Sequence, residues 1–398
     1  MTETPPMPVH IRRDRFDPVG ELVRMREEAP LSRMTLPWGM PAWLATRYDA
    51  VRTVLGDATR FSNSGAFGGR RGPMQGAGEA DRPNRTGFLL GYDPPEHTRL
   101  RKLLTAEFTV ARMRRLRPRV ETIVTEHLDA LAAAGAPADL VADFALPVPS
   151  LVICELLGVP YSDRDEFQRL SRARLDMSRD IEIRAAAGDQ ARAYMAGLIA
   201  EQRRSPGDGL LGRLIREHGD EIGDTELTGV ADLLLLAGHE TTSNMLGLGT
   251  LVLLRDPDQL AALRDPSRVD NSVEELLRYL SVVHTVTPRM ALTDVTLDGV
   301  EIKAGEVVLC SLPAANRDPS LGDDLDRVDL SRAVTTHVAF GHGIHHCIGA
   351  PLARMEMRIA YPALFDRFPT LRLAIPFEEV QFRAFSVVYG LSALPVAW

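Results

Sequence analysis

The sequence is poor in cysteine and has no long hydrophobic run. Its 398 residues include three cysteines, Cys154, Cys310 and Cys347. They are too few for a disulfide framework and indicate a reducing compartment, or a cysteine kept for its chemistry. No run of about 18 apolar residues is present, and the first residues lack the apolar core of a signal peptide. We therefore expect a cytoplasmic protein without a membrane span.

A basic excess is also absent, because 46 Lys and Arg residues stand against 54 Asp and Glu residues, for a formal net charge of −8. A general nucleic-acid binder would carry a basic excess, so no nucleic-acid partner is expected. The hydrophobic share of 45% and the charged share of 25% are typical of a folded soluble protein and exclude disorder as the main state. A chain of this length can bury a large core with an enclosed cavity.

The spacing of apolar residues predicts a mainly α fold with a minor antiparallel β part, formed by one unit over residues 1–398. The longest helix is predicted from residue 224 or 225 to about 254, and it is apolar on nearly all sides, which indicates a buried helix. Asp17-Pro18 and Asp256-Pro257 each predict an N-cap followed by the first helical position. Residues 48–55 predict a further helix, and Asn271 with Glu274 has the spacing of a capping box.

The β-rich part is predicted near residues 36–46, 294–310 and 380–398. A hairpin with a Gly39 turn is expected at 38–46, another with an Asp298-Gly299 turn at 294–302, and a third strand at 306–310. The last helix is predicted to begin just after Cys347 and to run to about residue 368. Residues 62–87 include seven glycines. A stretch of this kind is either disordered or a functional lid, and we interpret it as a lid.

Cys347 lies between a loop with two glycines and the start of that last helix. A helix N-terminus offers unpaired N–H groups and a partial positive charge, which stabilise the thiolate that binds metals. Gly349 allows a flat group to pack close to the backbone. On these residues alone three interpretations stay open: an axial haem ligand, a buried cysteine without function, or a zinc site. The zinc ligands would come from His337, His342, His345 or His346, at spacings that fit no common zinc pattern.

Three motifs together resemble the cytochrome P450 family. Phe340, Gly343, Cys347 and Gly349 match its F-x-x-G-x-x-x-C-x-G haem-binding signature. Glu275-Leu-Leu-Arg278 matches its E-x-x-R motif, and Ala237-Gly-His-Glu-Thr241 matches its oxygen-activation motif. E-x-x-R alone occurs often by chance, but the three motifs stand in the family's order and at its separations. The resemblance covers essentially the whole chain and is nearest to soluble actinobacterial members, which Asp93-Pro-Pro-Glu-His97 and the Leu394–Trp398 ending also resemble.

The resemblance implies the cytochrome P450 fold, with haem b between the long central helix and the cysteine loop and Cys347 as the axial ligand of the iron. His97, Arg101, Arg289 and His345 match positions that pair with the haem propionates, and buried carboxylates need such cationic or N–H partners. Gly238 would make space for oxygen. The implied cofactor-binding residues are His97, Arg101, Gly238, Arg289, Phe340, Gly341, His345, Cys347 and Gly349.

By the same resemblance, Glu240 and Thr241 are the catalytic acid–alcohol pair that delivers protons to dioxygen at the haem. The alternative for Thr241 is a bond back to its own helix that stabilises a kink, and both can hold. His239 is expected to be structural and to point away from the iron. Glu275, Arg278 and Arg332 are expected to form a buried network that holds the cysteine loop, rather than to take part in catalysis.

The substrate is expected to be bulky and apolar, because the implied pocket segments carry few polar groups. The pocket residues carried over from the family are Phe67, Phe88, Leu175, Leu234, Ala237, Val282, Val283, Val286, Phe385 and Val387. Electrons are expected from a ferredoxin and its reductase, since no flavin or iron–sulfur segment is recognised. Between Arg99 and Arg119 eight basic residues stand against the single acid Glu107. The ferredoxin is expected to dock there, near Arg99, Lys102, Arg112 and Arg115.

These features together indicate a haem-thiolate monooxygenase that inserts one oxygen atom from O2 into a secondary metabolite or a xenobiotic, acting as a monomer. Two alternatives stay open. A peroxygenase would use hydrogen peroxide, and family members of that type tend to lose the acid–alcohol pair. A haem-thiolate carrier or sensor would need neither Glu240-Thr241 nor a basic docking face. Neither the substrate nor the position attacked follows from the sequence.

Overall fold

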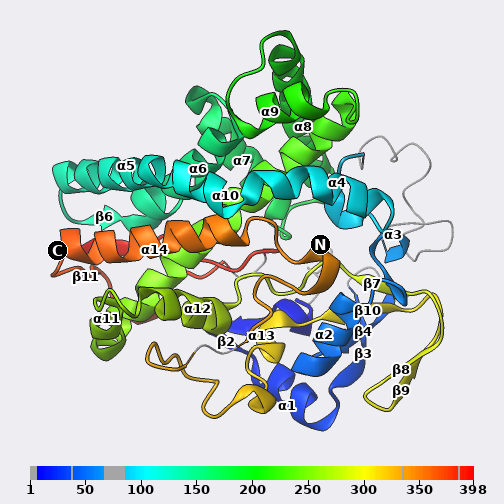
Figure 1. Cartoon of the computed structure of the whole chain (residues 1–398). Coiled ribbons are helices and arrows are strands. Elements are labelled where there is room, and N and C mark those ends of the chain that lie inside the picture. Colours follow the sequence, from blue (N-terminus) through cyan, green and yellow to red (C-terminus); the bar gives the residue numbers. More distant parts are fainter. Residues whose placement is uncertain (1–6, 37–38, 67–85, 334–335, 384–385) are drawn as a thin grey trace.

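The computed structural model describes residues 7–36, 39–66, 86–333, 336–383 and 386–398. Figure 1 shows most helices gathered in one part of the molecule and the largest sheet, with α1 and α2, in another. The α-helices are α1 Gly20–Glu28, α2 Tyr48–Gly56, α3 Asn63–Ala66, α4 Glu96–Thr105, α5 Val110–Ala134, α6 Pro147–Leu157, α7 Arg164–Leu175, α8 Ile181–Arg204, α9 Leu210–His218, α10 Asp224–Arg255, α11 Pro257–Leu263, α12 Val269–Leu280, α13 Leu312–Ala315 and α14 Ala350–Arg367. The predicted mainly helical class is confirmed.

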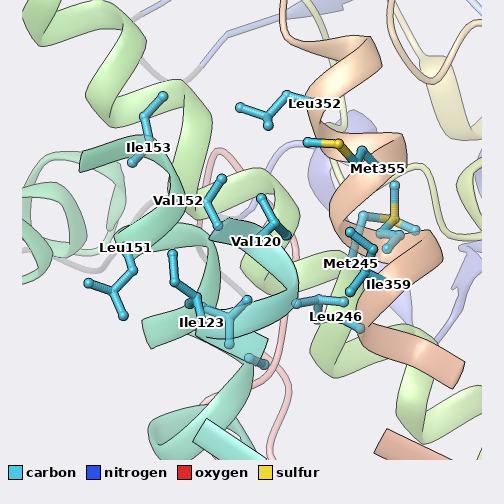
Figure 2. Close-up of a cluster of buried hydrophobic side chains, with 14 of the residues drawn as sticks. Val120, Ile123, Leu151, Val152, Ile153, Met245, Leu246, Leu352, Met355 and Ile359 are labelled. Atoms are coloured by element: carbon cyan, nitrogen blue, oxygen red, sulfur yellow. The ribbon is translucent and has the colours of Figure 1, made fainter. Parts of the chain in front are cut away.

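Helix α10 is the predicted long buried helix, at the predicted bounds. It contacts α6, α8, α12 and α14, and nearly every residue from Thr242 to Leu253 is buried. Figure 2 shows apolar side chains of α5, α6, α10 and α14 that converge on one core, among them Ile123, Met245 and Met355. A helix surrounded by other helices must be apolar on all sides, which is the pattern that the sequence showed.

The strands are β1 Arg13–Asp14, β2 Asp17–Pro18, β3 Leu31–Thr35, β4 Pro41–Ala45, β5 Phe61–Ser62, β6 Ala138–Asp139, β7 Arg289–Ala291, β8 Val295–Leu297, β9 Val300–Ile302, β10 Val307–Cys310, β11 Arg372–Leu373 and β12 Pro395–Ala397. The largest sheet has the order β3-β4-β10-β7-β5. It is mixed rather than purely antiparallel, because β10 runs parallel to β4.

Both predicted hairpins are present. β8 and β9 pair across a two-residue turn in which Asp298 and Gly299 have φ of 47° and 77°, as a turn between paired strands requires. The first hairpin pairs β4 with β3, so it begins at Leu31, earlier than predicted. The strand β10 belongs to the largest sheet and not to the β8–β9 hairpin. Near the C-terminus, β12 pairs with β11 and β6.

Two predicted helix starts are wrong because tertiary contacts outweigh the local signal. Asp17 and Pro18 form β2, and α1 begins at Gly20; the Asp17 carboxylate lies 3.0 Å from the Arg317 guanidinium, which holds the segment extended. Helix α12 begins at Val269, so Asn271 lies inside its first turn, where its side-chain amide donates to the carbonyl of Arg332. The Asp256 cap of α11 is confirmed, since its carboxylate accepts from two backbone N–H groups at 3.2 Å.

Candidate functional site

The loop that carries Cys347 is shaped by two glycines with left-handed backbone. Gly341 and Gly343 both have φ of 72°. A Cβ at Gly343 would lie 2.4 Å from the carbonyl oxygen of Leu55, so only glycine allows the loop to pack on α2. The Cys347 N–H donates to the carbonyl of Phe340 at 2.9 Å, and α14 begins three residues after Cys347, at Ala350. The predicted order of loop, cysteine and helix is therefore confirmed.

Cys347 differs from the other two cysteines in its surroundings. Cys154 and Cys310 are buried, whereas Cys347 is exposed, so its sulfur faces open space instead of packed side chains. The protein around it raises the pKa of the thiol by desolvation, while the N–H groups of Gly349 and Ala350 and the charge of Arg101 act in the opposite direction. The helix terminus thus favours the thiolate as predicted, but desolvation outweighs it in the protein alone; a bound metal would supply the further positive charge that a thiolate needs.

Helix α10 presents a small accessible patch in the middle of its buried length. Ala237 is exposed and Thr241 is partly exposed, although His239 and Glu240 between them are 1% exposed. Residues four apart lie on one face of a helix, so Ala237 and Thr241 open onto the same space. Gly238 points elsewhere, since a Cβ there would lie 2.8 Å from the Ile153 side chain of α6. The missing side chain lets α6 pack closely on α10 here, and the role of Gly238 in making space for oxygen stays a prediction.

Glu240 is buried and ionised. One carboxylate oxygen lies 3.4 Å from His239 Nε2, and the other lies 3.5 Å from Arg383 Nη1. Burial alone would raise the pKa of Glu240, but His239, Arg383 and Arg172 lower it to about 2. His239 turns into the helix, where its Nδ1 lies 3.0 Å from the carbonyl of Leu235. The Thr241 hydroxyl donates to the carbonyl of Ala237 at 2.8 Å, which is the bond back to its own helix that the alternative required.

A cavity of about 430 Å³ adjoins Glu240. Arg172, Arg179 and Arg383 line it, together with the α10 residues Ser243 and Asn244. Arg383 connects the two, because its guanidinium contacts the Glu240 carboxylate and donates to the Asn244 side chain. Sequence reasoning missed Arg172 and Arg383, since nothing in the sequence around either residue links it to α10.

Four groups that can bear positive charge or donate N–H bonds gather beside the cysteine loop. The rings of His97 and His345 are 4.2 Å apart, and the charges of Arg101 and Arg289 act on both rings. Burial, followed by Arg289 and His97, lowers the pKa of His345 to about 3, and burial lowers that of Arg289 to about 10.

The two histidines of this group are poorly satisfied by the protein itself, whereas Arg101 donates to the carbonyl of His346 and Arg289 to Thr287. In the part of the chain that the structure describes, His97 Nε2 and both ring nitrogens of His345 are buried without a hydrogen-bond partner. Buried polar atoms without partners are rare in folded proteins and point to a missing acceptor. Two carboxylates, such as the haem propionates, would fit there, and the accessible Cys347 sulfur fits an iron. The residues present therefore fit a haem. Among the described residues no three His, Cys, Asp or Glu side chains form a metal-binding group, so the zinc interpretation gains no support.

Glu275, Arg278 and Arg332 come together as expected. Arg278 donates to both Glu275 carboxylate oxygens at 2.7 Å and to the carbonyls of Asn316, Leu325 and Arg327 at 2.8 to 3.1 Å. Arg332 lies 3.4 Å from Glu275. All five N–H donors of the buried Arg278 guanidinium are therefore used. The network ties α12 to the segment 316–332 that precedes the cysteine loop.

The expected substrate residues are brought together in part. The Val387 N–H donates to the carbonyl of Leu175 at 3.2 Å, and Val283 bridges to Val388. Leu234 and Val282 are buried, and Phe88 and Val286 are half-buried. Phe67, Phe385 and most of the predicted lid lie outside the described residues. The sequence did not reveal how the segment after the lid is fixed: Gly87 and Gly229 pack so closely that a Cβ on Gly229 would lie 1.9 Å from the carbonyl oxygen of Thr86.

The comparisons with known proteins agree with this arrangement. The cytochrome P450 family model matches residues 184–373. Cytochrome P450 165B3 of Amycolatopsis orientalis is 46% identical over 402 residues, which cover 100% of both chains. The solved structure of P450 StaH, from the biosynthesis of a glycopeptide antibiotic, is 49% identical with a TM-score of 0.88 and covers 98% of this chain and 100% of that one. The structure of CYP105P1 in complex with filipin I is 44% identical with a TM-score of 0.90 and covers 97% of both chains.

An accessible cysteine at a helix terminus, beside buried ring nitrogens that lack a hydrogen-bond partner, fits a haem-thiolate protein. The chain belongs to the cytochrome P450 family, and it is a monooxygenase of the bacterial type. Within the described residues no helix is both long and apolar enough to cross a membrane.

Proposed function

We propose that this P450 binds haem b through Cys347 and inserts one oxygen atom from O2 into a bulky apolar molecule, by hydroxylation or epoxidation. The observation that carries the proposal is the accessible Cys347 sulfur beside the N–H groups of Gly349 and Ala350, at the start of α14. When bound, the haem supplies the iron that activates dioxygen. Arg101, Arg289, His97 and His345 would hold its two carboxylates.

Glu240 and Thr241 would deliver protons from two neighbouring positions of α10 that point in different directions. Glu240 is ionised and therefore able to accept a proton, and its carboxylate contacts Arg383, which lines the cavity of about 430 Å³. Thr241 lies on the accessible face of α10, and its hydroxyl must leave the carbonyl of Ala237 before it can donate in another direction. This proton supply is what a peroxygenase does not need, and it favours O2 over hydrogen peroxide.

The substrate would be a secondary metabolite or a xenobiotic. The segments that the Val387–Leu175 bond and the Val283–Val388 bridge bring together are apolar, as a pocket for an apolar molecule would be. The relatives described above, one from glycopeptide antibiotic biosynthesis and one bound to filipin I, are consistent with a bulky molecule.

Electrons would come from a ferredoxin and its reductase, in the cytoplasm, to a monomeric P450. Of the basic residues on α4 and α5, Arg99 pairs with Glu226 and Arg112 lies 3.4 Å from Glu107. Lys102, Arg114 and Arg115 are exposed and have no ion pair within the described ranges. These last three offer the most charge to an acidic partner, so the docking centre shifts from Arg99 and Arg112 toward them.

The spectrum of the reduced protein with carbon monoxide tests the haem assignment, because only a thiolate ligand gives the strongly red-shifted Soret band. Absence of that band from a haem-loaded sample contradicts the proposal. Turnover with a ferredoxin system and O2 then separates the monooxygenase from its alternatives. Product formed with hydrogen peroxide alone indicates a peroxygenase, and ligand binding without product in either system indicates a carrier or sensor.

A further inference from the structure

The two adjacent glutamates of α12, Glu274 and Glu275, point in different directions and bind different parts of the chain. Glu275 faces Arg278 and the segment 316–332, as described above. Glu274 faces the cysteine loop and α14: its carboxylate accepts from Arg354 Nε at 2.6 Å and from Arg354 Nη2 at 2.7 Å. A two-pronged pair of this kind fixes the plane of the guanidinium as well as its distance.

His337 is the second partner of Glu274, and its hydrogen bonds define one tautomer of the ring. The His337 Nδ1 accepts from the N–H of Ala339 at 3.2 Å, so the ring proton of the neutral form is on Nε2. That Nε2 lies 3.2 Å from the second Glu274 oxygen and donates to it. Arg354 and His337 together hold the pKa of Glu274 at about 2, against the upward effect of burial. Glu274 is therefore ionised and satisfied on both oxygens.

Arg354 carries this contact to the cysteine loop. Its guanidinium carbon lies 4.5 Å from the centre of the Phe340 ring, a cation–π distance. The carbonyl of Phe340 accepts the N–H of Cys347 at 2.9 Å. The charge of Arg354 also acts on the Cys347 sulfur and favours its thiolate. An unbroken set of contacts thus leads from Glu274 through Arg354 and Phe340 to the ligand residue.

We propose that Glu274 is a positioning residue for the Cys347 ligand: by fixing the Arg354 guanidinium against the Phe340 ring, it sets the geometry and the electrostatic surroundings of the thiolate. This inference rests on the proposed haem-thiolate function. It assigns to Glu274 a task that differs from that of Glu275, whose contacts all lie on the other side of α12. It also explains why Arg354 is an arginine, since a lysine can neither bind a carboxylate with two prongs nor stack a planar group on a ring.

The same two helices offer a matched control. Arg358 lies one helical turn beyond Arg354, pairs with Asp270 at 2.9 Å and approaches Glu274 at 3.8 Å. Within the described residues, both ion pairs of Arg358 are with α12, so loss of its charge loosens the α12–α14 contact without removing the group on the Phe340 ring. Arg358→Gln therefore reports the effect of one lost cation and a weaker helix contact.

The test compares wild type, Glu274→Gln, Arg354→Lys and Arg358→Gln as haem-loaded proteins, by reduction potential and by the decay of the thiolate-type carbon monoxide band. Glu274→Gln removes a negative charge and should shift the one-electron reduction equilibrium toward the reduced form three- to tenfold, or by about 30 to 60 mV. Its thiolate band should decay at least fivefold faster. Arg354→Lys keeps the charge but should show the faster decay, whereas Arg358→Gln should stay within twofold of wild type in decay rate.

Equal decay rates in wild type and Arg354→Lys overturn the inference, because charge alone would then suffice. A decay in Arg358→Gln as fast as in Glu274→Gln overturns it too, because general loosening of the helices would explain both. If Glu274→Gln does not fold, the decay rates of Arg354→Lys and Arg358→Gln are compared with each other, and that comparison tests the inference by itself. A wild type that lacks the thiolate band contradicts the proposed function itself, which is a different result from any of these.

Discussion

The buried pair of Glu275 and Arg278 gives the sharpest stability prediction. The side chain of Arg278 is fully buried and that of Glu275 is 4% exposed. Glu275 accepts two bonds from Arg278, one from the N–H of Asp329 at 3.0 Å, and a longer contact from Arg332. Glu275→Gln keeps the size but leaves an uncompensated guanidinium in the core, which costs about 3–5 kcal/mol.

The loss is measured as a fall in the denaturant midpoint of the haem-loaded protein, followed by far-ultraviolet circular dichroism. Glu121→Gln is the matched control, because Glu121 and Arg117 form an exposed pair at 2.8 Å on α5. That pair should contribute about 0.3–0.5 kcal/mol. If Glu275→Gln lowers the free energy of unfolding by less than about 1 kcal/mol, the reasoning is refuted, since a buried charge without its partner should destabilise the protein by more than that.

A double variant, Glu275→Gln with Arg278→Met, sharpens the argument. Replacing both members of a buried pair by apolar groups is often neutral in other proteins. Here it should not restore stability, because the carbonyls of Asn316, Leu325 and Arg327 would lose the donor that satisfies them. Recovery to within about 1 kcal/mol of wild type would show that those carbonyls find other partners.

Three further predictions concern other parts of the chain. Gly229→Ala should destabilise the protein by about 1–3 kcal/mol, because its Cβ would meet the carbonyl of Thr86; Gly197→Ala on α8, with nothing within 4 Å, should instead stabilise it in the same unfolding assay. The pKa of Glu240 is lowered from 4.5 to about 2, so ionised Glu240 stabilises the folded protein above pH 4.5, and this contribution is lost as the pH falls toward 2. The free energy of unfolding of Glu240→Gln, measured against pH, should therefore change less than that of wild type over this range. Arg115→Glu should slow first-electron transfer from a ferredoxin about tenfold at low salt, in stopped-flow reduction, and the difference should disappear at high salt.

Features with local signals could be predicted from the sequence. The bounds of α10 follow from its continuous apolar run, and the cap of α11 follows from Asp256-Pro257, whose carboxylate reaches only two and three residues ahead. The Asp17 cap failed because Arg317, 300 residues away, competes for the same carboxylate. The parallel pairing of β10 with β4 was not predictable, since its partners Cys310 and Ala45 are 265 positions apart and neither strand's pattern encodes its neighbour.

The site shows the same division. The motifs identified Cys347, Glu240 and Thr241, but the charges that set their surroundings come from distant segments. Arg383 and Arg172 act on Glu240 from the C-terminal segment and from α7, and Arg101 acts on Cys347 from α4. An isolated arginine carries no sequence signal of its target, because the target is chosen by the packing of helices.

The five residues 237–241 show why a contiguous motif does not form a contiguous surface. Successive residues of an α-helix are turned by about 100°, so neighbours in the motif point in different directions, while residues three or four apart lie near one another. Ala237 and Thr241 are accessible, Gly238 packs on Ile153, and Glu240 contacts Arg383 on another side. Under the proposed function, a proton held at Glu240 would therefore have to move from one side of α10 to another to reach Thr241. The Thr241 hydroxyl would also have to give up its bond to the carbonyl of Ala237 before it could donate elsewhere, so the helix geometry would set a condition on proton delivery.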